Sequence, residues 1–181
     1  MTMETKEKIL EAAERRVRKA GFTEMSFRDL AADVGIKSAS VHYHFPTKAD
    51  LGEALVERYT RQFKEKLDQI NMDDLFASLD GFVGLYGDAL VLQESICLCA
   101  IMGAESIGLP STINRYTKAF FDMNIAWLTR VLADHSIQNA EDIASMIVAA
   151  LEGGMIVAST SNDRSIFGQI SQTAIKCVLT K

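Results

Sequence analysis

The residues of this 181-residue chain best suited to chemistry lie in a short segment near the N-terminus. Hydroxyl, phenol, imidazole and ammonium groups are crowded into residues 38–48: Ser38, Ser40, His42, Tyr43, His44 and Lys48. Groups of these kinds hydrogen-bond to base edges and to phosphates. The segment therefore predicts a nucleic-acid contact surface. The alternative is a small helical bundle that merely packs, because the apolar pattern of its interior requires nothing more.

A first helix over residues 4–20 should precede this segment. Ile9, Ala13 and Val17 recur at helical spacing, and charged residues cover the remaining surface. Gly21 ends the helix, since glycine readily takes the left-handed conformation found at helix C-termini.

Two short helices separated by a glycine-containing turn are expected next. Ser26 and Asp29 have capping-box spacing and start a helix that ends at Gly35. The second helix, over residues 38–44, stops at Phe45 because a residue before proline is disfavoured in a helix. This is the helix-turn-helix pattern. Its interior should be formed by Leu30, Ala31, Val34, Ile36 and Val41.

The rest of the chain also predicts helices, and no run alternates with a period of two. Thr47 and Asp50 start a long helix to about residue 70. Further helices are expected over 72–91, 94–106, 111–135, 140–159 and 164–179. The fold class is all-α. An N-terminal three-helix, helix-turn-helix unit over residues 1–50 is followed by a larger helical body over residues 51–181.

The charge distribution suits a protein that approaches a polyanion by one end. The chain has a net charge of −5, with 19 Lys and Arg against 24 Asp and Glu. Nine of the basic and eight of the acidic residues fall within 1–50, which leaves ten and sixteen for residues 51–181. An odd number of cysteines and a charged N-terminus favour a cytoplasmic location. The most apolar stretch, residues 146–158, is interrupted by Glu152, Gly153 and Gly154 and is too short to span a membrane.

Residues 4–55 resemble the DNA-binding domain of the tetracycline-repressor (TetR) family. The likeness covers the Ile9-to-Ala13 helix, Gly21-Phe22 and the run from Ser26 to Ala31. It continues through Val34-Gly35-Ile36 and the segment 38–48, whose Phe45, Pro46 and Lys48 join the second short helix to the long one. The resemblance implies a transcriptional regulator, usually a repressor, with a DNA-binding domain over residues 1–50 and a helical ligand-binding and dimerisation domain over residues 51–181. Such a regulator binds a palindromic operator in double-stranded DNA as a dimer and is released by a small-molecule effector.

The same resemblance assigns roles to individual positions. Arg28 matches a base-reading position of the first short helix, and the start of the recognition helix is matched by Lys37, Ser38, Ala39 and Ser40. Positions that bind phosphate are matched by His42, Tyr43, His44 and Lys48. Lys37 replaces a common Ser or Thr cap, so we expect Ser38 to take over the cap. His42 stands where tyrosine is usual.

The C-terminal part offers candidates for an effector site of unknown specificity. Aromatic, Met and polar residues of the middle helices can line a pocket or form a core: Phe63, Tyr86, Met102, Glu105, Phe120, Phe121, Asn124 and Trp127. Cys97 and Cys99 are either small core residues or a thiol sensor. Ala149 with Gly153, and Ala150 with Gly154, allow close helix approach. The family resemblance then favours a homodimer interface built from the last two helices, over an internal helix pair.

Other chemistries find little support in the sequence. His42 and His44 lie about 200° apart on a helix and make a poor joint metal site. No nucleophile elbow, phosphate loop, dinucleotide fingerprint or zinc-protease motif is present, so neither an enzyme nor a cofactor is expected. The main alternative is a ligand- or thiol-responsive helical interaction protein without specific DNA binding.

Overall fold

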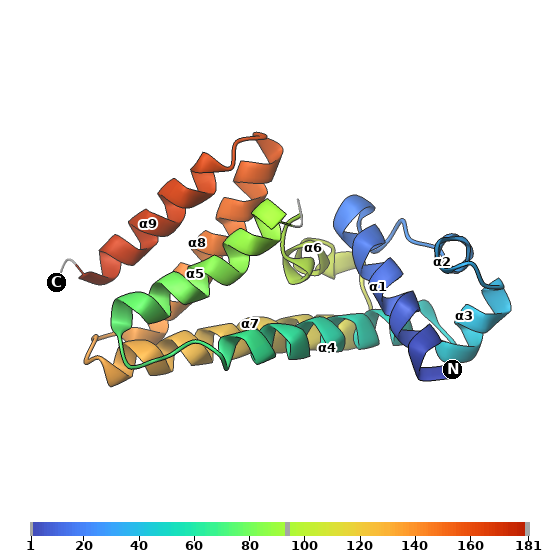
Figure 1. Cartoon of the computed structure of the whole chain (residues 1–181), viewed down its shortest axis with the longest axis horizontal. Coiled ribbons are helices and arrows are strands. Elements are labelled where there is room, and N and C mark those ends of the chain that lie inside the picture. Colours follow the sequence, from blue (N-terminus) through green and yellow to red (C-terminus); the bar gives the residue numbers. More distant parts are fainter. Residues whose placement is uncertain (1, 93–94, 180–181) are drawn as a thin grey trace. The chain divides into compact units, whose positions relative to one another are not determined.

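The computed structural model describes residues 2–92 and 95–179, and helices are the only regular elements in that part of the chain (Figure 1). Their bounds are α1 Thr2–Ala20, α2 Phe27–Val34, α3 Ser38–His44, α4 Lys48–Leu67, α5 Leu75–Leu92, α6 Leu98–Ala104, α7 Ser111–Asp134, α8 Ala140–Thr160 and α9 Ser165–Leu179. A short 3-10 turn, Ser106–Gly108, follows α6. The predicted all-α class is confirmed.

Helix boundaries agree with the sequence signals where those signals are local. Gly21 and Gly35 take left-handed backbone conformations directly after α1 and after α2. At the start of α4, Thr47 and Asp50 form a reciprocal capping box: the Asp50 carboxylate accepts from the Thr47 N–H at 2.8 Å, and the Thr47 hydroxyl accepts from the Asp50 N–H at 3.1 Å.

The helix expected over 94–106 is the main error in the sequence-based assignment. Residues 95–97 are not helical, and α6 begins only at Leu98, while Glu94 lies outside the described residues. The backbone N–H of Ser95 donates to the Ala89 carbonyl at 3.2 Å, a bond that closes the end of α5. Cys97 therefore precedes α6, and only Cys99 lies on it.

The chain forms two compact units. The first comprises residues 1–61 and 98–118, and the second comprises residues 62–97 and 119–181. In the first unit α2 packs against both α1 and α3, and α1 also packs against α6. Its core includes Ile9, Val17, Leu30, Val41 and Leu55, each fully shielded from solvent. The expected domain boundary at residue 50 stays a prediction, because compactness alone does not show which segments fold independently.

In the second unit α8 packs along α9, and both contact α5. Leu79, Phe82, Leu128, Leu151 and Met155 form the centre of this unit, each at most 1% exposed. Helix α8 is long and apolar enough, by length and composition, to cross a membrane, and 44% of its most apolar window is buried within the protein. A core helix of a globular protein passes the same test.

Candidate nucleic-acid interface and effector region

Helices α2 and α3 are held together by local capping and by a small shared core. The Ser26 hydroxyl accepts from the Asp29 N–H at 3.2 Å and donates to the Asp29 carboxylate at 2.5 Å. After α2, the N–H of Ile36 donates to the Ala31 carbonyl at 2.9 Å, which satisfies the helix end and turns the chain toward α3. Val41 is the residue of α3 that is fully buried. The other positions of this short helix are thus free to present their side chains outward.

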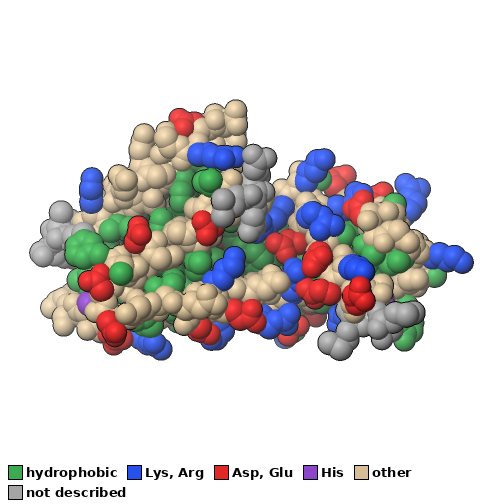
Figure 2. All heavy atoms as spheres, in the orientation of Figure 1, with side chains coloured by type: hydrophobic (Ala, Val, Ile, Leu, Met, Phe, Trp, Pro, Cys, Tyr) green, Lys and Arg blue, Asp and Glu red, His purple; other side chains and the backbone are tan. Residues whose placement is uncertain are grey.

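The predicted DNA-contact residues are all at least partly exposed. Arg28, Lys37, Ala39, His42 and Tyr43 are exposed. Partly exposed positions accompany them: Ser38, Ser40, His44 and Lys48. Tyr43 is 76% exposed, which is unusual for a side chain that could bury so much apolar area. On the visible face of the first unit, basic and acidic side chains are interspersed (Figure 2), in keeping with the near-neutral balance of residues 1–50.

Aromatic contacts restrain part of this surface. The His42 ring packs edge-on against Phe27 of α2, with 4.7 Å between ring centroids. The Tyr43 and His44 rings lie 5.3 Å apart in a similar arrangement. His42 is thereby oriented by α2 as well as by α3.

The expectation that Ser38 caps α3 is wrong. The cap residue is Lys37, whose backbone is extended (φ −78°, ψ 145°), and no side chain caps this helix. Ser38 instead occupies the first helical position, because the Ser40 N–H donates to the Lys37 carbonyl at 2.9 Å. The Lys37 side chain is exposed and remains available to a partner.

The loop between α1 and α2 is held by a carboxylate from a distant part of the sequence. Glu105, at the end of α6, accepts from the backbone N–H of Phe22 and of Thr23, each at 2.9 Å, and from the Thr23 hydroxyl at 2.6 Å. A Cβ added at Gly21 would lie 2.3 Å from a Glu105 oxygen, so this close approach requires glycine. Glu105, a candidate for the effector site, therefore lies in the first unit with its carboxylate engaged by the protein.

Lys48 contacts the same loop from the first turn of α4. Its ammonium group donates to the Thr23 carbonyl at 2.7 Å and lies 5.0 Å from the centre of the Phe22 ring. Burial lowers the pKa of Lys48, and the nearby carboxylates of Glu105 and Glu24 oppose that shift. Lys48 thus positions the loop that leads into α2, in addition to the phosphate-binding role predicted for it.

An ion-pair cluster joins α4 to α1 within the first unit. The Arg58 guanidinium, with 8% of its side chain exposed, hydrogen-bonds to the carboxylates of Glu7 and Glu14 and lies 3.8 Å from Glu11. The surrounding carboxylates offset the free-energy cost of removing the nearly buried Arg58 guanidinium from water. The cluster fixes the orientation of α4 relative to the helices that carry the contact surface.

The residues predicted to line an effector pocket are divided between the units. Met102, like Glu105, belongs to the first unit. Most of the others belong to the second: Phe63, Tyr86, Phe120, Phe121, Asn124 and Trp127. There the Phe63 ring contacts Tyr86 and Phe120, with centroids 5.4 and 5.1 Å apart, and Phe121 contacts Phe120.

Phe82 is a central member of this aromatic cluster that the sequence-based reasoning missed. It stacks on Trp127 with centroids 5.4 Å apart and contacts Tyr86 at 5.5 Å. The available signal was its position four residues before Tyr86, which places both rings on one face of α5. Asn124 is fully buried, and its side-chain amide donates to the Phe120 carbonyl at 2.8 Å.

The cysteines proposed as a thiol sensor are buried. Cys97 is 1% exposed and Cys99 is not exposed at all, which favours packing over reactivity, since reactive thiols are accessible. Cys97 lies beside Glu152 of α8, a buried carboxyl that the sequence marked only by interrupting an apolar run. Across the described residues, no group of three or more His, Cys, Asp or Glu side chains could hold a metal ion.

Comparison with known proteins agrees with this geometry. Residues 9–55 match the family model for "Bacterial regulatory proteins, tetR family". The chain is 25% identical over 186 residues to the HTH-type transcriptional regulator CymR of Pseudomonas putida, covering 96% of this chain and 89% of that protein.

Solved structures are also similar over nearly the whole length. A TetR transcriptional regulator from Legionella pneumophila superposes with a TM-score of 0.88 at 29% identity, covering 95% of this chain and 96% of the other. A TetR-family regulator from Agrobacterium tumefaciens gives 0.91 at 27% identity, covering 97% and 98%. The fold and the family-model match define a helix-turn-helix DNA-binding protein. These likenesses support a TetR-family transcriptional regulator: residues 9–55 match the family model, and solved TetR-family regulators match nearly the whole chain.

Proposed function

We propose that this regulator is a repressor that binds a palindromic operator as a homodimer and leaves it when a small molecule binds the second unit. The observation that carries the proposal is the exposed surface of α3, with Tyr43 at 76% exposure, inside a segment that matches the TetR DNA-binding domain. In this proposal residues 1–50 bind DNA, and residues 51–181 dimerise and hold the effector. The operator lies in the bacterial cytoplasm, and no catalytic step is involved.

Within the interface, base reading and phosphate binding fall to different residues. Lys37, Ser38, Ala39 and Ser40 lie at the start of α3, the end that enters the major groove in helix-turn-helix proteins. Arg28 of α2 joins them in base reading in this proposal. His42, Tyr43 and His44 lie at the end of α3, where they reach the flanking phosphates together with Lys48. Paired half-sites are expected about 34–36 Å apart or at a multiple of that spacing.

The outer face of α8 supports the dimeric arrangement. Three apolar side chains on it are exposed, Met146 and Ile156 at 41% and Val157 at 47%. A Cβ added at Gly153 would touch nothing, whereas one at Gly154 would lie 3.3 Å from Ile170 of α9. The two glycines thus have different surroundings: Gly154 packs against α9 within the chain, and Gly153 faces outward. An apolar face of this kind is covered by a second copy in our proposal.

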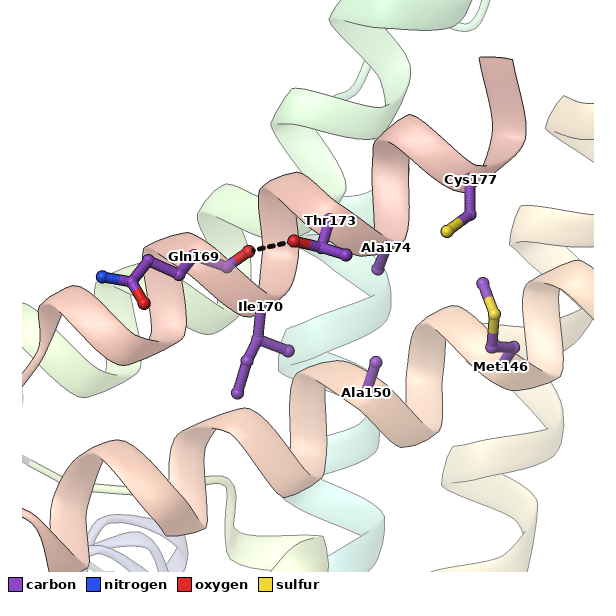
Figure 3. A pocket seen from close by; sticks show the side chains of 7 residues that line it. All are labelled: Met146, Ala150, Gln169, Ile170, Thr173, Ala174 and Cys177. Atoms are coloured by element: carbon purple, nitrogen blue, oxygen red, sulfur yellow. Dashed lines mark hydrogen bonds between the residues drawn. The ribbon is translucent and has the colours of Figure 1, made fainter. Parts of the chain in front are cut away.

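A groove between α8 and α9 continues this face (Figure 3). In the view, Ile170 and Ala150 point into the space between the helices, and Met146 and Cys177 point toward one another at its end. The Thr173 hydroxyl is satisfied by the Gln169 carbonyl at 2.8 Å and offers little to a polar ligand. The groove is lined by Met146, Ala150, Gln169, Ile170, Thr173, Ala174 and Cys177.

Selection of bound sequences from a random DNA pool, at a fixed salt concentration, tests the DNA-binding part of the proposal. The expected result is one palindromic site. Tyr43→Ala should weaken binding to all sequences about two- to tenfold, because the loss of one hydrogen bond to DNA corresponds to about 0.5–1.5 kcal/mol of binding free energy. Ser40→Ala should change the preferred base without a uniform loss.

Phe76→Ala, which removes an aromatic side chain 60% exposed on α5, is the matched control and should leave binding unchanged. Weak binding without sequence preference by folded, ligand-free protein would contradict the proposal and favour the interaction-protein alternative. For the dimer, Ile156→Glu should yield monomers in sedimentation, whereas Phe76→Glu should not. A dimer that persists in Ile156→Glu would place the interface elsewhere.

A further inference from the structure

The second unit contains a buried carboxyl whose oxygens have no ordinary hydrogen-bond donor. Glu152 of α8 is 8% exposed and is flanked by the core residues Leu151 and Met155. Throughout the described residues, neither of its carboxylate oxygens has a nitrogen or oxygen donor within hydrogen-bonding distance. The polar group beside it is the thiol of Cys97, a weak donor.

This arrangement is unfavourable for an ionised carboxyl in the absence of a partner. Burial raises the pKa of Glu152 well above its ordinary value, and the adjacent Cys97 raises it further. Moving an ionised group from water into the protein interior without a counter-charge is strongly unfavourable, whereas burying an apolar side chain at the same place is favourable. A positively charged partner would remove this cost and stabilise the ionised form.

The side-chain oxygen of Asn124, in the same unit, is also buried without a hydrogen-bond donor among the described residues. The Asn124 amide nitrogen donates to the Phe120 carbonyl at 2.8 Å, which fixes the orientation of the amide group. Its oxygen, shielded from solvent, then has no donor among the residues that the structure describes. The ionised Glu152 carboxylate and the Asn124 oxygen each offer acceptors, so a molecule that satisfies either group brings N–H or O–H donors.

We propose that Glu152 is the anionic anchor of the effector site and that the effector is an organic cation. Its charged group is an ammonium or amidinium that pairs with the Glu152 carboxylate, and its remainder is apolar. The aromatic cluster of Phe82, Tyr86 and Trp127 in the same unit suits such a remainder. This inference rests on the proposed function, in that the second unit binds the effector. Once Glu152 is ionised, it repels a carboxylate, phenolate or phosphate at the same place, because like charges repel in a buried site.

Fluorescence of Trp127 provides a direct binding assay, because it is the only tryptophan of the chain and stacks on Phe82. The probes are benzylammonium, 2-phenylethylammonium and hexylammonium, each paired with the alcohol and the carboxylate of the same skeleton. They are titrated into full-length protein at neutral pH and constant ionic strength. At least one ammonium ion should bind tenfold or more tightly than its matched alcohol, and the carboxylates should not bind.

Glu152→Gln keeps the size of the side chain and removes its charge. It should lower ammonium affinity to that of the matched alcohol, and Glu152→Met should do the same. Glu141→Gln, which changes an exposed carboxylate of the same helix, is the matched control and should have no effect. The inference is overturned if no ammonium ion binds more tightly than its alcohol, or if the preference survives in Glu152→Gln. Circular dichroism melting establishes that each variant is folded.

Operator binding, measured separately, distinguishes failure of this inference from failure of the proposed function. A protein that selects no operator but binds ammonium ions through Glu152 would contradict the repressor proposal and leave the cation site intact. A protein that selects a palindromic operator but shows no cation preference would contradict only the cation site. Release of operator by the bound ammonium ion, lost in Glu152→Gln, is the expected result when both hold.

Discussion

The contact of Glu105 with the loop before α2 should contribute measurably to the stability of the DNA-binding surface. The perturbation is Glu105→Ala, which removes the acceptor of three hydrogen bonds, two from backbone N–H groups and one from the Thr23 hydroxyl. Thr23 is exposed, and water can replace its two bonds. The bond from the Phe22 N–H is partly buried and should account for most of the effect.

The expected loss is about 2 kcal/mol, close to the value for one shielded hydrogen bond to a charged group and well below the sum of three. A loss of this size speeds local opening about thirtyfold, at about 1.4 kcal/mol for each factor of ten. It should lower the melting temperature by about 4–8 °C in a protein of this length. Because the loop leads directly into the Ser26 cap of α2, operator affinity should fall as well.

Amide hydrogen exchange, read at Phe22 and Thr23 by nuclear magnetic resonance, is the assay. Glu57→Ala, which removes an exposed carboxylate from α4, serves as the control and should leave both rates unchanged. Unchanged protection of the two amides in folded Glu105→Ala would contradict this prediction, since it would mean that the carboxylate does not hold the loop in solution.

Three further predictions concern other parts of the structure. Gly52→Ala should lower the free energy of unfolding, measured in urea, by about 1 kcal/mol, because an added Cβ meets Ile113 at 2.5 Å and Phe22 at 2.8 Å. This steric cost outweighs the gain in helix propensity of about 1 kcal/mol. A more stable variant would show that both side chains move aside. Arg58→Met should lower the free energy of unfolding by about 2 kcal/mol in the same assay, less than for a fully buried ion pair because the acidic partners of Arg58 remain partly hydrated. Arg58→Lys should cause a smaller loss than Arg58→Met. Equal losses in the two variants would argue against the ion-pair cluster. Glu152→Gln should leave stability unchanged below about pH 4 and should increase it relative to the native protein as the pH rises above 4.5. The reason is that the pKa of Glu152 is raised in the folded protein, so its ionisation favours the unfolded state. A difference in melting temperature between variant and native protein that stays constant across pH would contradict this.

Elements whose signals are local could be predicted from the amino-acid sequence. The end of α1 at Gly21, the capping boxes of α2 and α4, and the stop of α3 before Pro46 each depend on groups a few residues apart, so their spacing can be read along the chain. The motif that identified the family lies in this same region. The boundaries of α6 were misjudged because the bond from Ser95 back to Ala89 has no equally strong signal in residue types.

Contacts between groups far apart in the sequence became visible only in the folded protein. Glu105 is far along the chain from Phe22, and nothing in its neighbours indicates that it binds backbone N–H groups of an N-terminal loop. The sequence could not separate Glu105 from the aromatic residues grouped with it, or show that Glu152 is buried beside Cys97. The physical reason is that a charged side chain on an apolar helix has the same sequence pattern whether it faces solvent or the interior. Its environment is fixed by the helices that pack around it.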